Sequence, residues 1–278
     1  MSEWQNVWLA PAKLNLFLHV IGRRDDGYHL LQTAFRLIGR CDLLRFAPSP
    51  AVRLARPLAG VKEEDELCVR AARMLQEETG CRHGVTISLE KRIPIGGGLG
   101  GGSSDAATTL WALNRLWQLR LPRERLAGLG LRLGADVPFF IFGRNAFAQG
   151  VGEALAPLDL PPAWYVVLTP PVAVPTARIF ADPELTRNTK SIKISGFSVG
   201  FGHNDLEPVA CRHYPAVRAH LNWLSKFGTA RMSGSGACVF AEFSTEAEAQ
   251  SVVSRLPGTM QGFVAPALDR HPVMGGTE

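Results

Sequence analysis

The sequence of 278 residues lacks any apolar run close to the roughly 20 residues that a helix needs to cross a bilayer. Its first ten residues, MSEWQNVWLA, hold Glu3 and no basic side chain, so they do not resemble a secretory signal peptide. The sequence also has no internal repeat and no low-complexity tract. These absences predict a globular protein that stays in the cytoplasm and has no membrane partner.

Cysteine is scarce, and basic residues barely outnumber acidic ones. The cysteines are scattered and never form a CxxC pair, which argues against a disulfide framework and a structural zinc site. The net charge is +5, and the densest basic pairs are Arg23–Arg24 and Lys91–Arg92. Because no basic stripe is present, we expect no nucleic-acid partner. The mild positive charge is compatible with a small anionic substrate.

Hydrophobic residues make up 46% of the chain, enough for a sizeable core, and their spacing changes along the sequence. Short apolar or alternating runs between turn residues predict strands at 14–21, 33–38, 43–46 and 85–89. Helical spacing of apolar residues predicts helices at 66–77, 103–116 and 122–132, the first of which ends at Gly80.

A composition break at residues 158–162 predicts a linker, which divides the chain into a lobe at 1–158 and a lobe at 159–278. Beyond the linker we predict strands at 164–168 and 239–243 and helices at 208–225 and 245–256. Residues 186–203 have little periodicity and predict a loop, which either closes over substrate or stays loose. Strands and helices do not alternate regularly, so the predicted fold class is α+β.

The strongest local signal is PIGGGLGGGSSD at residues 94–105, between a predicted strand and a predicted helix. Its glycines allow positive φ angles and close approach of the backbone to a ligand. The helix that follows adds its positive dipole end and unpaired amides, which together suit a phosphate group. A flexible linker is the alternative, but a linker is not expected directly before a strongly amphipathic helix. The residues predicted to bind nucleotide phosphates are Pro94, Gly96, Gly97, Gly98, Leu99, Gly100, Gly101, Gly102, Ser103 and Ser104.

The two serines of this loop can cap the helix or supply hydroxyls to phosphate and metal. No lysine follows the last glycine, so the loop is not a Walker A motif. No βαβ pattern surrounds it, as a Rossmann fingerprint would require. The sequence therefore predicts phosphate binding by a different fold from either.

One carboxylate, Asp136, stands between a small-residue turn and the apolar run VPFF, which we predict to begin a strand. A carboxylate in such surroundings can accept a proton from a substrate hydroxyl during phosphoryl transfer. Taken alone, the motif is equally typical of a structural turn aspartate, and that alternative would be favoured.

Lys13 and Asn15 are predicted to lie on the same face of the first strand. A core-facing lysine needs a partner such as phosphate or Asp136, whereas on an exposed edge it would be a solvated charge. Near the other end of the chain, MSGSGAC at 232–238 predicts a turn before a strand. This turn is either a simple hairpin or a second backbone wall near the phosphates.

The lysine strand, the glycine-rich loop with its helix and the late SGSGA turn together resemble the GHMP kinase superfamily in order and spacing. The resemblance implies a two-lobed α+β fold with the active site in the cleft between the lobes, ATP as donor and Mg²⁺ on its phosphates. It implies that Asp136 takes the proton of a substrate hydroxyl. Lys13 would pair with Asp136 and steady the transferring phosphoryl group. No protein ligand of the metal is predicted.

A narrower match extends from Pro11 to about Val264 and includes KLNL at 13–16, DGYH at 26–29, GADVPFF at 134–140 and QGVGE at 149–153. It resembles the kinases that phosphorylate the 2-hydroxyl of a cytidine diphosphate-linked methylerythritol in the non-mevalonate isoprenoid pathway. The small-molecule substrate would then have its cytidine end held by aromatic stacking and hydrogen bonds. The residues implied to bind substrate are Asn15, Tyr28, His29, Thr176 and Phe180.

Carboxylates replace the asparagines expected from the family at residues 65–68 and at Asp105, which would change nucleotide or metal contacts there. One alternative is another GHMP kinase, of homoserine or mevalonate type, which would have no reason to carry Tyr28 and His29. The other is a nucleotide- or RNA-binding protein without catalysis, against which Lys13 and Asp136 argue. No long exposed apolar stripe is predicted, which favours a monomer or a weak homodimer.

Overall fold

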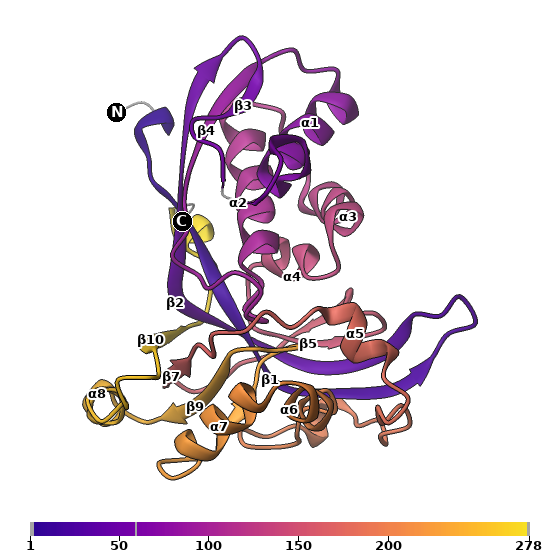
Figure 1. The fold of residues 1–278 in the computed structure, drawn as a ribbon. Coiled ribbons are helices and arrows are strands. Elements are labelled where there is room, and N and C mark those ends of the chain that lie inside the picture. Colours follow the sequence, from indigo (N-terminus) through magenta and orange to yellow (C-terminus); the bar gives the residue numbers. More distant parts are fainter. Residues whose placement is uncertain (1–2, 59, 277–278) are drawn as a thin grey trace.

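A computed structural model of the chain describes residues 3–58 and 60–276, and one long antiparallel hairpin dominates it (Figure 1). In this hairpin, β1 (Trp8–Arg23) pairs with β2 (His29–Ser49). The prediction of two separate strands at 33–38 and 43–46 was wrong. Between them, Gly39 and Arg40 form a bulge opposite the Pro11/Ala12 step, so the ladder continues past these two residues.

The hairpin forms the spine of a mixed sheet. Among the described residues the sheet has ten strands in the order β3-β4-β2-β10-β7-β9-β8, with β1 and β5 also paired to β2 and β6 paired to β5. Of the strand pairs in this described sheet, only β3–β4 is parallel. The remaining strands are β3 (Val52–Leu54), β4 (Gly84–Glu90), β5 (Ala146–Gln149), β6 (Ala154–Pro157), β7 (Trp164–Leu168), β8 (Arg231–Met232), β9 (Val239–Phe243) and β10 (Gly262–Leu268).

The helices of the first lobe cover one side of the sheet (Figure 1). The helices predicted at 66–77, 103–116 and 122–132 are confirmed, with ends shifted by at most two residues. The first ends as predicted at Gly80, whose φ is +68°. These helices are α1 (Leu67–Thr79), α2 (Gly101–Leu116), α3 (Arg123–Leu133) and α4 (Val137–Phe142), with 3₁₀ turns at Glu3–Gln5 and Glu63–Asp65.

The second lobe carries its helices around β7, β9 and β10, and the strands predicted at 164–168 and 239–243 are confirmed. The single helix predicted at 208–225 was wrong, because the chain leaves helical geometry at Tyr214 (φ −128°, ψ 87°). The next residue is Pro215, which lacks an N–H and disfavours the α conformation in the residue before it. The helices are α5 (Thr176–Ala181), α6 (Glu207–His213), α7 (Pro215–Leu224) and α8 (Glu246–Val253), with 3₁₀ turns at Ile194–Gly196 and Pro272–Gly276.

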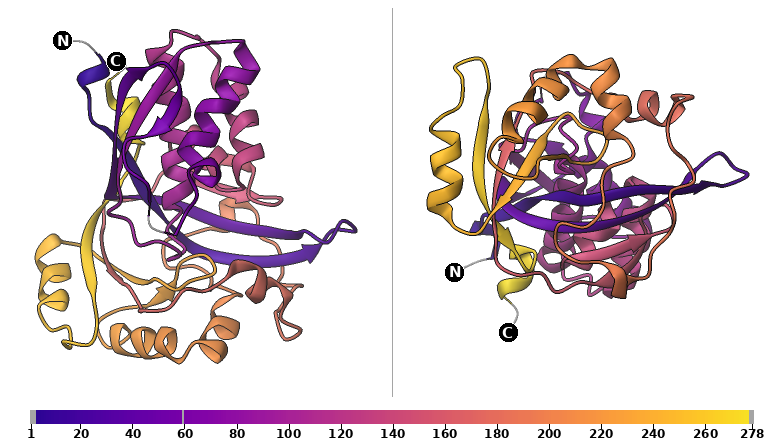
Figure 2. Two further views of the ribbon diagram at one scale, coloured as in Figure 1. Left: turned by 45° about the horizontal axis from the view of Figure 1, so that its top comes forward. Right: turned by 90° about the horizontal axis from the view of Figure 1, so that it is seen from below.

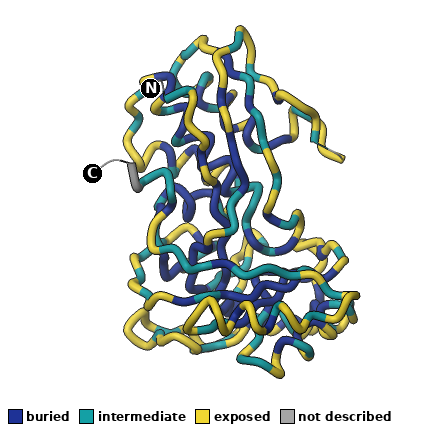
Figure 3. The backbone as a smooth tube through the Cα atoms, turned by 90° about the vertical axis from the view of Figure 1, so that its left-hand side faces the viewer, coloured by how far each residue is buried: buried dark blue, intermediate teal, exposed yellow. Residues whose placement is uncertain are grey.

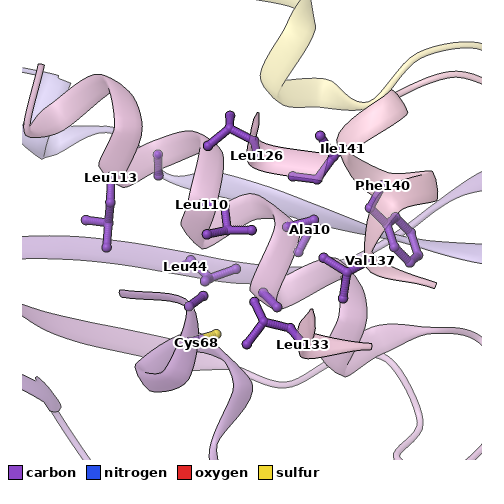
Figure 4. Close-up of a cluster of buried hydrophobic side chains, with 14 of the residues drawn as sticks. Ala10, Leu44, Cys68, Leu110, Leu113, Leu126, Leu133, Val137, Phe140 and Ile141 are labelled. Atoms are coloured by element: carbon purple, nitrogen blue, oxygen red, sulfur yellow. The ribbon is translucent and has the colours of Figure 1, made fainter. Parts of the chain in front are cut away.

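Each lobe has its own hydrophobic core, and the hairpin contributes to both. Figure 3 shows buried residues running through the interior of both halves. In the first lobe the helices pack on the sheet, and Figure 4 labels Ala10, Leu44, Cys68, Leu110, Leu113, Leu126, Leu133, Val137, Phe140 and Ile141 from this cluster. The second core joins Leu18 and Val20 of β1 to residues of β7, β9 and α5–α8. The far end of the hairpin projects beyond both groups of helices (Figure 2).

The loop predicted at residues 186–203 is confirmed, and the structure attaches it to the hairpin. The Thr189 N–H donates to the carbonyl of Val20 (3.1 Å). The side-chain amide of Gln32 donates to the carbonyl of Ile192 (3.0 Å) and accepts from its N–H (2.9 Å). This segment therefore lies along the hairpin, held by backbone as well as side-chain hydrogen bonds.

No helix in the described part of the chain is long and apolar enough to cross a membrane.

A buried histidine near the end of the chain makes the stability of the fold depend on pH. The His271 ring is fully buried, its Nδ1 accepts from the Val273 N–H (3.3 Å), and its Nε2 lies 3.3 Å from the Thr108 hydroxyl. Burial lowers its pKa from the usual 6.5 to about 3. Between these values the unfolded chain binds a proton and the folded chain does not. The unfolding free energy should therefore fall by about 1.4 kcal/mol per pH unit as the pH drops from 6.5.

Urea unfolding of the wild type and His271→Gln between pH 7.5 and 4.5 would measure this effect. The variant should have a lower unfolding free energy than the wild type at pH 7.5. The difference in unfolding free energy between the two proteins should become smaller as the pH falls, because only the wild type loses the stability that comes from the neutral His271 ring. His83→Gln, at an exposed position, is the matched control and should follow the wild-type slope. Parallel curves for wild type and His271→Gln would contradict the assignment.

Candidate active site

A cavity of about 790 Å³ lies where the hairpin, the glycine-rich loop, α4, α5 and the turn between β8 and β9 converge. It brings together predicted residues that are far apart in the sequence. The predicted site residues that line it are Lys13, Asn15, Tyr28, His29, Gly96, Gly98, Gly100, Ser103, Asp136, Thr176 and Phe180. The other predicted loop residues, Pro94, Gly97, Leu99, Gly101, Gly102 and Ser104, do not line the cavity themselves.

The charged centre of the cavity is an ion pair. Lys13 is only 3% exposed, and its Nζ lies 3.3 Å from Oδ2 of Asp136 and 2.5 Å from Oδ1 of Asn15. Lys13 and Asn15 share a face of β1, as predicted. Because a buried ammonium is costly without partners, these two contacts account for a lysine in the middle of an apolar strand. The Nζ also lies 5.3 Å from the ring centre of Phe35.

Hydrogen bonds hold the Asn15 side chain in the orientation in which its oxygen accepts from Lys13. Its Nδ2 donates to the Thr33 hydroxyl (3.0 Å), and that hydroxyl donates to the carbonyl of Phe17 (2.5 Å). With its amide nitrogen committed to Thr33, Asn15 presents its oxygen to Lys13. Thr33 also lines the cavity, although no role was predicted for it from the sequence.

Asp136 precedes a helix rather than the predicted strand, so that prediction was wrong. The run VPFF looked like a strand because it is apolar on all sides, but α4 is buried against its neighbours almost all round. Pro138 lies in the first turn of α4, where a missing N–H has no consequence. Asp136 occupies the N-cap position without capping the helix. Its carboxylate, 35% exposed, is thereby left to face Lys13 and the cavity.

The glycine-rich loop is anchored by the buried side chain of Leu99 and by two neighbouring segments. Leu99 is 1% exposed, and its carbonyl accepts from the Lys13 N–H (2.9 Å). The Ser233 hydroxyl donates to the carbonyl of Gly98 (3.0 Å), and the Cys238 N–H donates to that of Gly97 (3.1 Å). The turn between β8 and β9 is therefore both a hairpin and a backbone wall against this loop.

Only glycine fits at the centre of the loop. Gly98 has a φ of +73°, and a Cβ there would lie 2.1 Å from the carbonyl oxygen of Ser233. Gly100 has a φ of +71° and is the N-cap of α2, which excludes the first of the two roles considered for Ser103 and Ser104, that of capping this helix. The helix begins earlier, and its first amides are left without a side-chain cap beside the cavity. Such an uncapped, electropositive helix end suits an anion.

The end of the cavity nearest the hairpin tip is aromatic. The rings of His29 and Phe180 lie 4.9 Å apart at 30°, and Tyr28 is 65% exposed. The pKa of His29 is lowered, first by its burial and then by the positive charges of Arg187 and Arg23. Arg187 was missed by the sequence reasoning, because nothing local marks a loop arginine 158 residues away as a partner of His29.

The turn between β8 and β9 also contacts the start of α5. The hydroxyls of Thr176 and Ser235 lie 2.7 Å apart and share a hydrogen bond, and both residues line the cavity. Ser235 was noted only as part of a small-residue turn. Its pairing with a residue of α5 links the glycine-loop wall to the aromatic end of the cavity.

The two departures from the family pattern lie outside the cavity lining. Glu66 caps α1 by accepting from the Cys68 N–H (2.6 Å). Asp105 is fully buried, and its Oδ2 accepts from Lys91 Nζ (2.5 Å), which also pairs with Asp42. Burial raises the pKa of both Glu66 and Asp105. Both carboxyl groups are thus engaged in local contacts of the first lobe.

Comparison with known proteins gives a consistent assignment over most of the chain. Residues 66–144 match the model of the GHMP kinases N terminal domain, and residues 190–261 match that of the GHMP kinases C terminal domain. A protein of Thiobacillus denitrificans named 4-diphosphocytidyl-2-C-methyl-D-erythritol kinase is 65% identical over 266 residues. That alignment covers 95% of this chain and 96% of the relative.

Solved structures agree with this. A crystal structure of 4-(cytidine 5'-diphospho)-2C-methyl-D-erythritol kinase has a TM-score of 0.83 at 36% identity, covering 94% of this chain and 99% of that one. A crystal structure of mevalonate kinase has a TM-score of 0.67 at 13% identity, covering 96% of this chain and 100% of that one. At that identity the second likeness concerns the fold alone.

Proposed function

Because the chain belongs to the GHMP kinases, and among them to the 4-diphosphocytidyl-2-C-methyl-D-erythritol kinases, we propose that it phosphorylates that substrate in the non-mevalonate isoprenoid pathway. ATP is the phosphoryl donor in this family of kinases. The acceptor is the 2-hydroxyl of the methylerythritol unit. The alternatives of homoserine or mevalonate type share only the fold, and a protein without catalysis would have no need of the Lys13–Asp136 pair.

The observation that carries the proposal is the arrangement of one cavity. Its middle holds Lys13 and Asp136, one wall is the glycine-rich loop, and the far end holds His29 and Phe180. A substrate with a polyol at one end and a cytidine at the other could place both ends in this space. The cavity volume of about 790 Å³ falls in the range usual for small-molecule sites.

In the proposed mechanism Asp136 accepts the proton of the 2-hydroxyl, and the oxygen attacks the γ-phosphorus of ATP. The bond between the γ-phosphorus and the bridging oxygen breaks, and ADP leaves. Lys13, already held by Asn15, keeps its ammonium beside the reacting oxygen and the transferring group, where negative charge must be stabilised. The chain's main contribution is then positioning and electrostatic stabilisation.

The residues of the loop fit the phosphates of ATP. Gly98 and Gly100 have positive φ angles and line the cavity, and the uncapped start of α2 offers N–H groups to an anion. We propose that Mg²⁺ accompanies ATP and neutralises the charge of its phosphates. No group of three or more His, Cys, Asp or Glu side chains in the described ranges could hold a metal ion. The ligands of Mg²⁺ would thus be mainly phosphate oxygens and water, with Ser103 and Asp136 lining the same cavity.

The test is ATP consumption by the purified protein with Mg²⁺ and one of three acceptors: the cytidyl substrate, homoserine or mevalonate. We expect ADP to form with the cytidyl substrate alone, and ³¹P NMR should show one new phosphate monoester on the product. Turnover only with homoserine or mevalonate would agree with the assignment to the superfamily but would contradict the proposed substrate. No turnover with any acceptor would favour a protein that only binds nucleotide.

Several broader features are proposed on the same basis. We propose that the enzyme works in the cytoplasm as a monomer or weak homodimer, with neither nucleic acid nor membrane as a partner. The dispersed charges of the sequence support this. We also retain the division into lobes at 1–158 and 159–278 as a proposal, supported by the position of residues 158–162 between β6 and β7.

A further inference from the structure

Arg187 lies next to the aromatic end of the cavity and is hydrogen-bonded to the His29 ring. Its Nε donates to Nε2 of His29 (3.1 Å). The rest of the guanidinium is fixed by backbone carbonyls, with Nη1 donating to Leu185 (3.1 Å) and Nη2 to Phe180 (2.9 Å) and Asp182 (2.8 Å). The guanidinium is therefore held in one orientation by four hydrogen bonds, three of them independent of His29.

This arrangement decides which nitrogen of His29 carries the proton. A guanidinium has only donors and stays charged in proteins, so Nε2 of His29 must act as an acceptor. In a neutral imidazole the other nitrogen is then the donor, and the hydrogen is on Nδ1. Both burial and the charge of Arg187 lower the pKa of His29, which agrees with a neutral ring. A protonated ring would place an N–H against the Nε–H of Arg187.

We propose that Arg187 is a positioning residue that fixes the Nδ1–H form of His29 and thereby selects cytosine over uracil. The inference rests on the proposed function, in which His29 meets the base. His29 lines the cavity, whereas Arg187 does not. No hydrogen bond occupies Nδ1 of His29 within residues 3–58 and 60–276, so its N–H is available to a ligand.

The two pyrimidines differ in what they offer to this donor. N3 of cytosine is a hydrogen-bond acceptor, whereas N3 of uracil carries a hydrogen and is a donor. The Nδ1–H of His29 can therefore bond to N3 of cytosine but would face a second donor in uracil. A buried donor left without an acceptor costs more free energy than a hydrogen bond usually contributes to binding. The mismatch should therefore weaken the binding of uracil. Without Arg187 the ring could exchange its proton between nitrogens and present an acceptor to uracil.

The first experiment reads the tautomer without any turnover. ¹⁵N NMR of histidine-labelled protein at pH 7.5 distinguishes protonated from unprotonated ring nitrogens, and His29→Gln identifies the signals of His29. In the wild type we expect the hydrogen on Nδ1. In Arg187→Met, which keeps an unbranched apolar chain but no donor, the population should shift towards the Nε2–H form that free histidine prefers.

A matched control perturbs the same segment without touching His29. Arg212 contacts Asp182 (2.6 Å) and also pairs with Glu184. Arg212→Met should therefore loosen residues near Arg187 but leave the tautomer of His29 unchanged. A shift in the control as large as that in Arg187→Met would mean that general loosening, and not the Arg187 hydrogen bond, sets the tautomer, and would overturn the proposal.

The second experiment measures kcat/KM for the cytidyl substrate and for its uridine counterpart. The wild type and Arg212→Met should prefer cytidine by about tenfold or more, and this ratio should fall towards one in Arg187→Met. An unchanged ratio in Arg187→Met, with cytidyl turnover intact in the wild type, overturns the selection of cytosine and leaves the proposed function standing. If the wild type turns over neither compound, the proposed function itself fails, while the NMR result still decides the tautomer.

Discussion

Asp136→Asn is expected to lower kcat by about 10²–10⁴-fold, because an amide cannot accept the proton of the substrate hydroxyl. The substitution keeps the size of the side chain at the start of α4, where the carboxylate makes no capping bond that would be lost. The lysine partner remains hydrogen-bonded to Asn15. The effect should therefore fall on the chemical step, with a much smaller change in KM.

Steady-state kinetics of Asp136→Asn, together with calorimetric binding of ATP, would separate catalysis from binding. ATP affinity should remain within a few-fold of the wild type. The control is Asp159→Asn, since the Asp159 side chain is 97% exposed and its ion pair is with Arg144, at 3.3 Å. It should leave kcat unchanged. Turnover of Asp136→Asn at the wild-type rate would exclude Asp136 as the base.

Gly98→Ala is expected to be the most disruptive single substitution in the glycine-rich loop. The new Cβ would lie 2.1 Å from the Ser233 carbonyl oxygen and 3.1 Å from that of Gly236, both of which belong to backbone and cannot rotate away. Either the loop or the turn between β8 and β9 must move. Overpacking of this kind typically destabilises a protein by about 1–3 kcal/mol, and a displaced loop should weaken ATP binding by about tenfold or more.

Gly96→Ala provides a matched comparison. Gly96 has a φ of +69°, close to that of Gly98, but a Cβ there would meet nothing within 4 Å. The backbone strain of about 1–2 kcal/mol should be common to both variants, and only Gly98→Ala should add the clash. Urea unfolding of the two proteins would measure the difference. Equal destabilisation would mean that the contact with Ser233 can relax without cost.

Local sequence signals predicted those parts of the fold that depend on local physics. The periodicity of 103–116 and the glycines before it predicted α2 and its electropositive end, and Gly80 predicted the end of α1. Lys13 could be predicted to need a partner because burying an unpaired ammonium in an apolar strand costs free energy in any fold. These features depend on residues close together in sequence or on a cost that any buried environment imposes.

The failures had longer-range causes. The two strands predicted within β2 are one strand, because a bulge in the pairing with β1 accommodates Gly39 and Arg40. Pairing partners of this kind cannot be read from one strand alone. The run after Asp136 is apolar on all sides, which does not distinguish a buried strand from a buried helix. Arg187 could not be identified because its role depends on the position of His29, in a distant part of the chain.

Contacts between residues so far apart in sequence also affect the chain while it is being synthesised. The first strand is made long before the segments that bury it. Leu18 and Val20 of β1 leave the ribosome early, yet their partners in the second core come from β7, β9 and α5–α8, more than a hundred residues later. A nascent chain therefore carries an apolar strand whose packing surface has not yet been synthesised. Such exposed strands are prone to association, so chaperone capture would be most useful during this interval.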